Sequence, residues 1–590
     1  MISYMASQFK LPIEYQKKTH ILQNNIIDDL ELITTQPNEN EEKNTPIFHT
    51  IFEPTNIHET QVVEQISKYY TNDTKFLKDN QTMLKTNDFD EYLLDNSELS
   101  CCSEIFQDNN FINKYSYIDI KYFSFLNNSQ WFLQFISIIN LLSPVFSLIA
   151  PIIGLIVPYF VMRFKGVVIP IEQYYNFMKM LIFEQGMGKL IFNFSKLTLQ
   201  NQMYTAFTVI MYIFQIYNNI KYCFKFKSNM NNMCGYLDDI SCYLDNALLN
   251  IQQYKSSIQN IKSFQPFLND LEENEKILLE YRDFITDSPK KWTISNLLDI
   301  GYTMKCFYVF YNEENIKNAI DYSVSFNSYL KMLRHLKNKV KSKQLNYGKY
   351  NKKNKVSMKK TYYANIEKGK AVKNDISLDK NLIITGPNAS GKTTIIKSVQ
   401  INVILLQQMG VGFFESASIH PYHSLFCYLN IPDTSARDSL FQAEARRCLD
   451  IVNYIKEHPT HRIFCIFDEL YSGTNPEEAI ASAYAFIHYL CENKIDFLLT
   501  THFTQLCKSL ESIKSNENNK SNENDKSNEN NKRIKNCKME IETTDDGFKY
   551  MYKVDDGISN IRGAVKVLKD LNYPSDILEK TNKYLMSYNN

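Results

Sequence analysis

The spacing of hydrophobic residues changes along this chain of 590 residues. Between residues 229 and 345 they recur three or four positions apart, as at Leu237, Ile240 and Leu244, which is the spacing of one helix face. This pattern predicts an all-α core or lever region in which no side chain stands out as catalytic. Residues 1–110 are polar and acidic with weak periodicity, which predicts a partly ordered N-terminal region.

Two stretches without charged residues lie between these regions. No charge occurs between Lys121 and Arg163, and the apolar run 131–162 exceeds the about 20 residues that cross a bilayer. A second uncharged run, 197–220, is shorter and more polar at its edges. We therefore expect a membrane-associated region over 111–228, with one transmembrane segment followed by a second span or an interfacial helix. The alternative is that both runs are buried core helices of a soluble domain.

Charge is balanced over the whole chain but unevenly distributed. Apolar residues make up 44% and charged residues 22%, which excludes global disorder. Residues 1–100 carry 8 basic and 17 acidic residues, whereas 331–360 carry 12 basic residues and no acidic one. The basic run fits a solvated linker, a contact with nucleic-acid phosphates or a contact with anionic lipid headgroups.

Two further features carry no chemistry. The 12 cysteines are scattered without a C-x-x-C pair, which indicates reduced thiols and not a disulfide scaffold. A six-residue polar unit, SNENNK or SNENDK, runs in tandem over 515–532. Such a repeat cannot bury a core, so it predicts a disordered insertion over 514–533.

The strongest chemical signal is the segment 382–394, which reads LIITGPNASGKTT. It places an apolar strand before G-x-x-x-x-G-K-T, and an apolar helix follows through 395–406. Glycines let backbone N–H groups surround phosphate, and the helix N-terminus adds its positive dipole. Lys392 is expected to reach the β- and γ-phosphates of ATP, and Thr393 to ligate Mg²⁺. The expected nucleotide-binding residues are Gly386, Pro387, Asn388, Ala389, Ser390, Gly391, Lys392, Thr393 and Thr394.

An acidic pair follows a second apolar strand, 463–467. Asp468, at the end of this strand, is expected to hold Mg²⁺. Glu469 is expected to orient or deprotonate the attacking water, which indicates a hydrolase. A third apolar strand, 498–501, ends at His502, which is placed to sense the γ-phosphate. Glu469, His502 and Lys392 are therefore the candidate catalytic residues.

This part of the chain resembles the ATPase domain of MutS proteins, within the ABC-type ATPases. The resemblance rests on TGPNASGKTT (385–394), FDELYSGTN (467–475) and TTHF (500–503). It implies an α/β P-loop ATPase domain over 375–590, with a basic linker and an approach strand over 346–374. Further matching positions are Asn374–Leu378, Ser439–Phe441 with Glu444, Asp555–Gly557 and Gly563.

The resemblance also implies a dimer with two nucleotides between its subunits. Ser439 would meet the nucleotide of the partner subunit, and Asn388 would lie at the same composite interface. Gly473 and Thr474 would belong to the loop that couples the two sites, and His502 would be the switch histidine.

Several family features are missing. No Phe-x-Glu wedge, which mismatch-reading members carry, precedes the helical middle. Ala371 and Val372 occupy the region where an aromatic residue often stacks on adenine. The uncharged span resembles the membrane-anchored MutS-like group instead of the soluble repair enzymes.

Three uses of the ATPase compete on this basis. The first is a dimeric ATPase that couples turnover to DNA binding, as in mismatch repair, and the family and the basic run favour it. The second is a membrane-anchored mechanochemical ATPase that acts on a protein or lipid partner, with the ATPase domain in the cytosol. The third is a structural or regulatory dimer with little turnover, which the intact Asp468–Glu469 pair opposes.

Overall fold

The computed structural model describes residues 9–35, 45–94, 104–106, 108–167, 169–184, 198–353, 355–366, 369–429, 440–517, 534–544, 547–559, 565, 568–569 and 571–587. The chain divides into two compact units. Unit 1 comprises residues 1–94, 251–272 and 324–590, and unit 2 comprises residues 95–250 and 273–323. Unit 2 is therefore inserted twice into the sequence of unit 1.

Unit 1 contains a six-stranded sheet in the order β10-β11-β12-β7-β13-β14. Neighbouring strands are parallel from β10 to β13, and β14 pairs antiparallel with β13 at the edge. The strands are β7 (Asn381–Thr385), β10 (Ser424–Tyr428), β11 (Ile463–Asp468), β12 (Asp496–Thr501), β13 (Ile534–Thr544) and β14 (Gly547–Asp556). The three strands predicted from the sequence around the candidate site are thus present and share one sheet.

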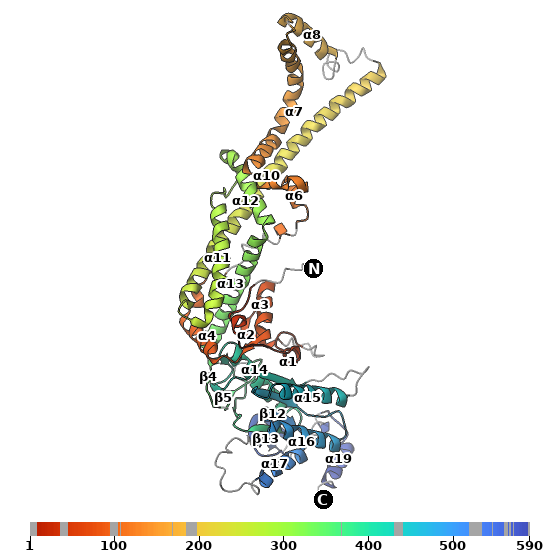
Figure 1. The fold of residues 1–590 in the computed structure, drawn as a ribbon. Helices are drawn as coiled ribbons and strands as arrows, with labels where there is room; N and C mark the ends of the chain where they lie inside the picture. Colours follow the sequence, from red (N-terminus) through yellow and green to blue (C-terminus); the bar gives the residue numbers. More distant parts are fainter. Residues whose placement is uncertain are drawn as a thin grey trace. The chain divides into compact units, whose positions relative to one another are not determined.

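Helices cover both faces of this sheet. Alternate strand residues, such as Phe426, Cys465 and Phe497, share one core cluster with α15 (Leu440–Glu457), α16 (Pro476–Glu492) and α17 (Thr504–Glu517). The intervening residues, such as Leu382 and Ile466, are also buried and face the other way. On that side α14 (Lys392–Gln408) contacts β11 and β12 (Figure 1). A further helix, α19 (Ser575–Ser587), lies near the end of the chain.

The approach strand predicted at Asn374–Leu378 is present as β6, but the stretch 346–374, predicted as a basic linker before it, contains further strands. A four-stranded sheet has the order β4-β9-β5-β6, and β3 pairs with β8. Buried Val356 and Met358 explain the difference, because alternating apolar residues are hidden among the lysines. The strands are β3 (Asn346–Tyr347), β4 (Lys349–Tyr350), β5 (Ser357–Thr361), β6 (Asn374–Ser377), β8 (Val411–Gly412) and β9 (Ser416–Ile419).

The N-terminal segment differs most from its prediction. Instead of a partly ordered polar region, residues 9–35 and 45–94 form a packed layer of unit 1, with Phe48, Phe52 and Phe76 fully buried. Polar residues terminate its helices, so they dilute the periodic signal without preventing a core. Its elements are η1 (Pro12–Tyr15), β1 (Thr19–Ile21), α1 (Asn24–Asp29), α2 (Ile47–Phe52), α3 (Ile57–Lys68), β2 (Tyr69–Thr71), α4 (Thr74–Thr86) and η2 (Phe89–Glu91).

Buried amides join this layer to the end of α14. The side chain of Gln408 donates to the carbonyls of Ile66 (2.8 Å) and Tyr69 (3.0 Å). The neighbouring Gln407 donates to the carbonyl of Thr71 at 3.2 Å. Both glutamines are at most 2% exposed, so losing these acceptors would leave buried donors unpaired. The N-terminal layer is therefore fixed to the same helix that begins at Lys392.

Part of the basic run is paired within unit 1. Its first part lies on α13 (Glu314–Lys341), and Arg334 and Lys337 donate to backbone carbonyls of the N-terminal layer. The acidic excess of residues 1–100 supplies the counter-charges. The ion pairs are Lys331–Glu59 (2.7 Å), Lys339–Glu53 (2.6 Å) and Lys341–Asp90 (2.8 Å).

Unit 2 is helical. It contains α6 (Phe111–Lys114), η4 (Lys121–Asn128), α7 (Gln130–Phe164), α8 (Ile171–Glu184), η8 (Ile294–Asp299) and α12 (Ile300–Asn312). It shares α10 (Leu199–Ile258), α11 (Gln265–Ile285) and α13 with unit 1, which also has the short η7 (Lys262–Phe264). The boundary predicted at 228–229 lies inside α10, because that helix continues through it.

The base of α7 packs tightly on α12. A Cβ on Gly301 would lie 2.3 Å from the carbonyl oxygen of Gln130, so only glycine fits this crossing. The Gln134 side chain accepts from the Gly301 amide at 2.8 Å and donates to the carbonyl of Leu297 at 2.8 Å. Farther along α7 the large apolar side chains are exposed.

Among the described helices, one is long and apolar enough to cross a membrane. It is the Gln130–Ala150 part of α7, with a mean hydropathy of 1.9, and only 17% of it is buried. The second predicted span, 197–220, begins outside the described residues and otherwise forms the first part of α10, which does not reach this hydropathy.

Two smaller predictions have mixed outcomes. The insertion predicted over 514–533 lies outside the described residues from 518 onward, whereas 514–517 continue α17. Every cysteine that the structure describes is free, and Cys101 and Cys102 lie outside the described residues.

The Lys331–Glu59 pair generates a stability prediction. Glu59 is buried and also accepts from the Thr55 amide at 2.6 Å. Burial raises the pKa of Glu59, but the bonds from Lys331 and Thr55 outweigh it, so the pKa lies below the ordinary value. We expect Lys331→Met to lower the free energy of unfolding by about 3 kcal/mol near pH 7, because it strands a buried carboxylate. Urea unfolding of the full chain measures this change.

Acid dependence gives the second readout for the same pair. A depressed carboxyl pKa stabilises the fold above the unfolded value, about pH 4.3, and this stability is lost as the pH falls through the folded pKa. The deficit of Lys331→Met should therefore shrink on acidification. Exposed Lys352, from the same basic run, provides the matched control Lys352→Met. Equal stability of both variants at pH 7 would contradict the prediction.

Candidate functional site

Three parallel strands bring the predicted site residues to one edge of the sheet. The strands β7, β12 and β11 are neighbours, with Thr501 opposite Thr385 and Asp468 opposite Thr500. Their carboxyl ends therefore lie side by side, where ligands of open α/β sheets bind. The loop 386–391 leaves β7 at this edge, and α14 begins immediately after it at Lys392.

The loop 386–391 has the backbone of a tight anion cradle. Ala389 and Gly391 have left-handed φ values of 63° and 90°. A Cβ on Gly386 would lie 2.9 Å from the Ser390 hydroxyl, so this glycine permits a close approach of the chain. The Ser390 hydroxyl donates to the carbonyl of Pro387 at 2.7 Å. The loop is thus closed on itself at the N-terminus of a 17-residue helix.

Lys392 is buried at the centre of this cradle. Its side chain is 5% exposed, and Nζ donates to the carbonyls of Gly386 (3.0 Å) and Pro387 (3.2 Å). Burial lowers the pKa of Lys392, whereas the nearby carboxylates of Glu469 and Asp468 act in the opposite direction. The ammonium is therefore poorly solvated and held inside the loop, where a phosphate would be a stronger acceptor than the two carbonyls.

A pair of oxygen groups lies beside the lysine. The Thr393 hydroxyl donates to Asp468 Oδ2 at 2.7 Å, and the Thr500 hydroxyl donates to Asp468 Oδ1. Hydroxyl and carboxylate oxygens are the hard ligands that Mg²⁺ takes. Since Asp468 is oriented from both sides by threonines on α14 and β12, its carboxylate is fixed before any ligand binds.

A glutamate–histidine pair completes the edge. His502 Nε2 lies 2.6 Å from Glu469 Oε1 and 3.4 Å from Lys392 Nζ. The hydrogen bond from His502 lowers the pKa of Glu469, and burial opposes it without cancelling it. Glu469 has a left-handed φ of 53°, and its amide donates to the carbonyl of Thr500 at 3.1 Å. This backbone turns the carboxylate away from the strand and toward the loop.

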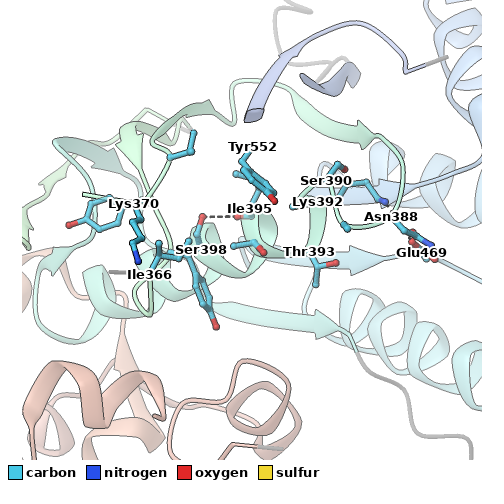
Figure 2. Close-up of a pocket in the computed structure, with 16 residues that line it drawn as sticks. Ile366, Lys370, Asn388, Ser390, Lys392, Thr393, Ile395, Ser398, Glu469 and Tyr552 are labelled. Atoms are coloured by element: carbon cyan, nitrogen blue, oxygen red, sulfur yellow. Dashed lines mark hydrogen bonds and ion pairs between the residues drawn. The ribbon is translucent and has the colours of Figure 1, made fainter. Parts of the chain in front are cut away.

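Lys392, Thr393 and Glu469 line a cavity of about 440 Å³, and Asp468 and His502 lie directly behind them as partners of Thr393 and Glu469. In Figure 2, Lys392, Thr393 and Glu469 lie at one end of this cavity and Lys370 at the other, with Tyr552 near its middle. The wall also includes Tyr362 and Tyr363. The sequence indicated no aromatic residue for this site, because these tyrosines come from β14 and from the turn after β5, far from the P-loop signature.

The ring of Tyr552 lies directly on the loop. A Cβ on Gly391 would come within 3.0 Å of this ring, and Tyr552 is 46% exposed. The side chain of Asn374 donates to the carbonyl of Tyr552 at 3.0 Å and accepts from the amide of Val554 at 2.8 Å. Asn374 thus fixes the left-handed backbone of Tyr552, whose φ is 55°. An exposed, fixed aromatic face is suited to stacking on a planar ring.

Glu444 connects α15 to the segment after Glu469. Its carboxylate is 2% exposed and accepts from the Ser472 amide (3.1 Å), the Ser472 hydroxyl (3.0 Å) and the Gly473 amide (3.2 Å). A Cβ on Gly473 would lie 2.8 Å from the Phe441 amide, so the segment and the start of α15 are in close contact. Ser439, predicted to meet a partner's nucleotide, lies outside the described residues, as does Gly563.

Known proteins resemble this domain. Residues 382–589 match the family described as MutS domain V. This domain of the chain is therefore similar to the corresponding domain of MutS proteins. Among similar curated proteins is the DNA mismatch repair protein MutS of Bacteroides fragilis (strain YCH46), with 30% identity over 227 residues, 37% of this chain. Proteins of the same name from Persephonella marina (strain DSM 14350 / EX-H1) and Clostridium tetani (strain Massachusetts / E88) are each 27% identical, over 36% and 38% of this chain.

The matched part of the chain covers 23–24% of the length of these three relatives. The similarity to MutS therefore concerns the domain that carries the predicted site. It includes all residues from Gly386 to Thr394, the pair Asp468–Glu469 and His502.

Loss of the Glu444 anchor should destabilise the MutS-type domain. We expect Glu444→Ala to reduce the free energy of unfolding by roughly 2 kcal/mol or more, because it leaves three donors without their buried acceptor. Urea unfolding followed by far-UV circular dichroism measures this. Glu457→Ala, at an exposed position of the same helix, is the matched control. A Glu444→Ala protein as stable as the control would show that water replaces the carboxylate.

Proposed function

We propose that this chain is a Mg²⁺-dependent ATPase of MutS type. The observation that carries the proposal is that buried Lys392, Thr393 and Glu469 line one cavity, where Asp468 bonds to Thr393 and His502 to Glu469. A phosphate cradle, a set of hard oxygen ligands and a positioned carboxylate are the parts that phosphoryl transfer to water needs.

Each part has a distinct proposed role. The amides of the loop 386–391 and the ammonium of Lys392 would bind the phosphates and stabilise negative charge during transfer. Thr393 and Asp468 fit a magnesium ion, which when bound neutralises charge on the phosphate oxygens. Glu469, whose low pKa keeps it ionised, would accept a hydrogen bond from the attacking water and orient it. His502 would hold the Glu469 carboxylate in position.

We further propose a homodimer in which turnover is coupled to DNA. The dimer is supported by the similarity to MutS domain V, and Asn388 is exposed on the loop where a partner subunit would complete the site. The relatives are DNA mismatch repair proteins, which supports DNA as the partner. The part of the basic run that is exposed, including Lys352 and Lys353, is the surface available for phosphate contacts.

A second proposal is attachment to a membrane, with the ATPase domain in the cytosol. It is supported by the apolar and exposed part of α7. Under this proposal the ATPase would act on a protein or lipid partner at the bilayer.

Glu469→Gln separates nucleotide binding from hydrolysis. We expect this variant to bind ATP as the wild type does and to hydrolyse it about 100-fold more slowly or less, since it removes the water-positioning charge. Phosphate release and bound radiolabelled ATP are measured on the full chain, with Glu477→Gln, exposed at the start of α16, as control. Unchanged phosphate release from Glu469→Gln would refute its proposed role.

The same assay tests the DNA proposal. Homoduplex, mismatched and branched DNA should raise the ATPase rate, and the increase should weaken with salt and in Lys352→Gln/Lys353→Gln. A rate that no DNA changes would leave the ATPase in place and favour a partner at the membrane.

Tyr552→Ala tests the aromatic ring that lies against the loop near the middle of the cavity. We expect nucleotide affinity to fall roughly tenfold or more, since stacking of a base on an aromatic ring contributes about 1–3 kcal/mol. Titration of a fluorescent ATP analogue measures this. Tyr552→Phe keeps the ring and should bind as the wild type does; equal affinity of the alanine and phenylalanine variants would exclude stacking.

A further inference from the structure

The faces of α7 and α10 in unit 2 are arranged opposite to those of a soluble helix pair. In water, helices bury apolar side chains against each other and expose polar ones. Here polar side chains lie between the helices. The Tyr212 hydroxyl donates to the Ser147 carbonyl at 2.8 Å, the Asn219 amide donates to the Ser147 hydroxyl, and the Cys223 thiol lies 3.4 Å from the carbonyl of Asn140.

The polar residues of α10 follow a single stripe. Thr208, Tyr212, Gln215, Asn219 and Cys223 are spaced three or four residues apart, so they share one helix face. Tyr212 and Asn219 are partly buried, as is the apolar Ile216 between them, whereas Gln215 is exposed. The outward side chains of α10 are apolar and 43–70% exposed: Met203, Tyr204, Phe207, Ile210, Met211, Ile213, Phe214, Tyr217 and Ile220.

The same arrangement holds on α7. Asn140, Ser143 and Ser147 are half-buried, and each serine hydroxyl is satisfied by a carbonyl one turn earlier. Phe135, Ile139, Leu142, Val145, Phe146 and Leu148 are exposed. Thus both helices present hydrocarbon outward and keep hydrogen-bonding groups at their contact, which is how helices associate in lipid.

The absence of charged residues and the antiparallel directions of α7 and α10 also fit association in lipid. The segment of α7 beyond its contact with α12 carries no charge up to Arg163, and α10 carries none from Leu199 to Lys221. Each is long enough for a hydrocarbon layer of about 30 Å. The contacts pair Asn140 with Cys223 and Ser147 with Tyr212, so the helices run antiparallel, and α7 leads to α8 before α10 returns (Figure 1).

We propose that α7 and α10 enter a lipid bilayer together as an antiparallel hairpin held by the Ser147–Tyr212–Asn219 contact. This inference rests on the proposed membrane attachment and extends it from one apolar helix to two. It places both feet of the hairpin on the same side of the bilayer. The mean hydropathy of α10 is lower than that of α7 because polar residues of α10 belong to the contact between the two helices and not to the lipid-facing surface.

The test uses the full chain reconstituted with neutral phosphatidylcholine vesicles, which excludes simple attraction to anionic headgroups. The measurement is the fraction that remains with floated vesicles after an alkaline carbonate wash. Phe146→Lys on α7 and Phe214→Lys on α10 should each reduce this fraction at least about fivefold, because lysine is costly in hydrocarbon. Leu279→Lys, which alters an exposed leucine of α11, should not change it. Phe214→Leu should remain bound, and circular dichroism of each variant should show unchanged helix content.

The outcomes separate the two proposals. If Phe146→Lys releases the chain and Phe214→Lys does not, α7 crosses alone and the hairpin is overturned while membrane attachment stands. If the wild type itself fails to float, both fall, and self-association through these faces, measured by sedimentation, becomes the explanation. Release by both lysine variants, with the leucine variant retained, supports the hairpin.

Discussion

The burial of α14 is the constraint on which the rest of unit 1 depends. The helix is covered by the six-stranded sheet along one side and by the N-terminal layer at its end. Its first residues, Lys392 and Thr393, line the cavity of the candidate site, and its last, Gln407 and Gln408, bind carbonyls of the N-terminal layer. The single helix α14 therefore connects the loop 386–391 to a layer that lies far away in the sequence. A movement of the loop must either move this layer through α14 or break the buried hydrogen bonds at the end of the helix.

The local signals of the site could be predicted from the sequence because its chemistry is local. A strand, a glycine loop and a helix are consecutive in the chain, and Asp468 and His502 each follow their own apolar strand. That Thr500 and Thr393 both orient Asp468 could not be predicted, since strand order decides it. Tyr552 could not be predicted for the same reason. It lines the cavity because the β13–β14 hairpin lies beside the loop, and the sequence near the loop contains no sign of this hairpin.

The acidic and basic segments show a second limit of sequence reasoning. Taken separately, residues 1–100 suggest a partly ordered polar region, and residues 331–360 fit a linker or a surface for nucleic acid or lipid. The structure joins Glu53, Glu59 and Asp90 to lysines of α13, so part of each imbalance is the counterpart of the other. A run of like charges indicates a binding surface only if its charges are not already paired with opposite charges within the same fold. The polar composition of the N-terminal segment likewise gave no indication of its core. Many of its polar residues have structural roles, because they cap helices or form hydrogen bonds with the end of α14.

Unit 1 is assembled from three separate stretches of the chain, with unit 2 encoded between them. During synthesis the N-terminal layer leaves the ribosome hundreds of residues before α14, the helix that covers it. The apolar residues of the N-terminal layer therefore lack their packing partner until α14 has been synthesised, whereas α7 and α10 of unit 2 are synthesised before α14. The order of translation thus completes the apolar helices of unit 2 before the strands and the loop that line the cavity of unit 1 have been synthesised.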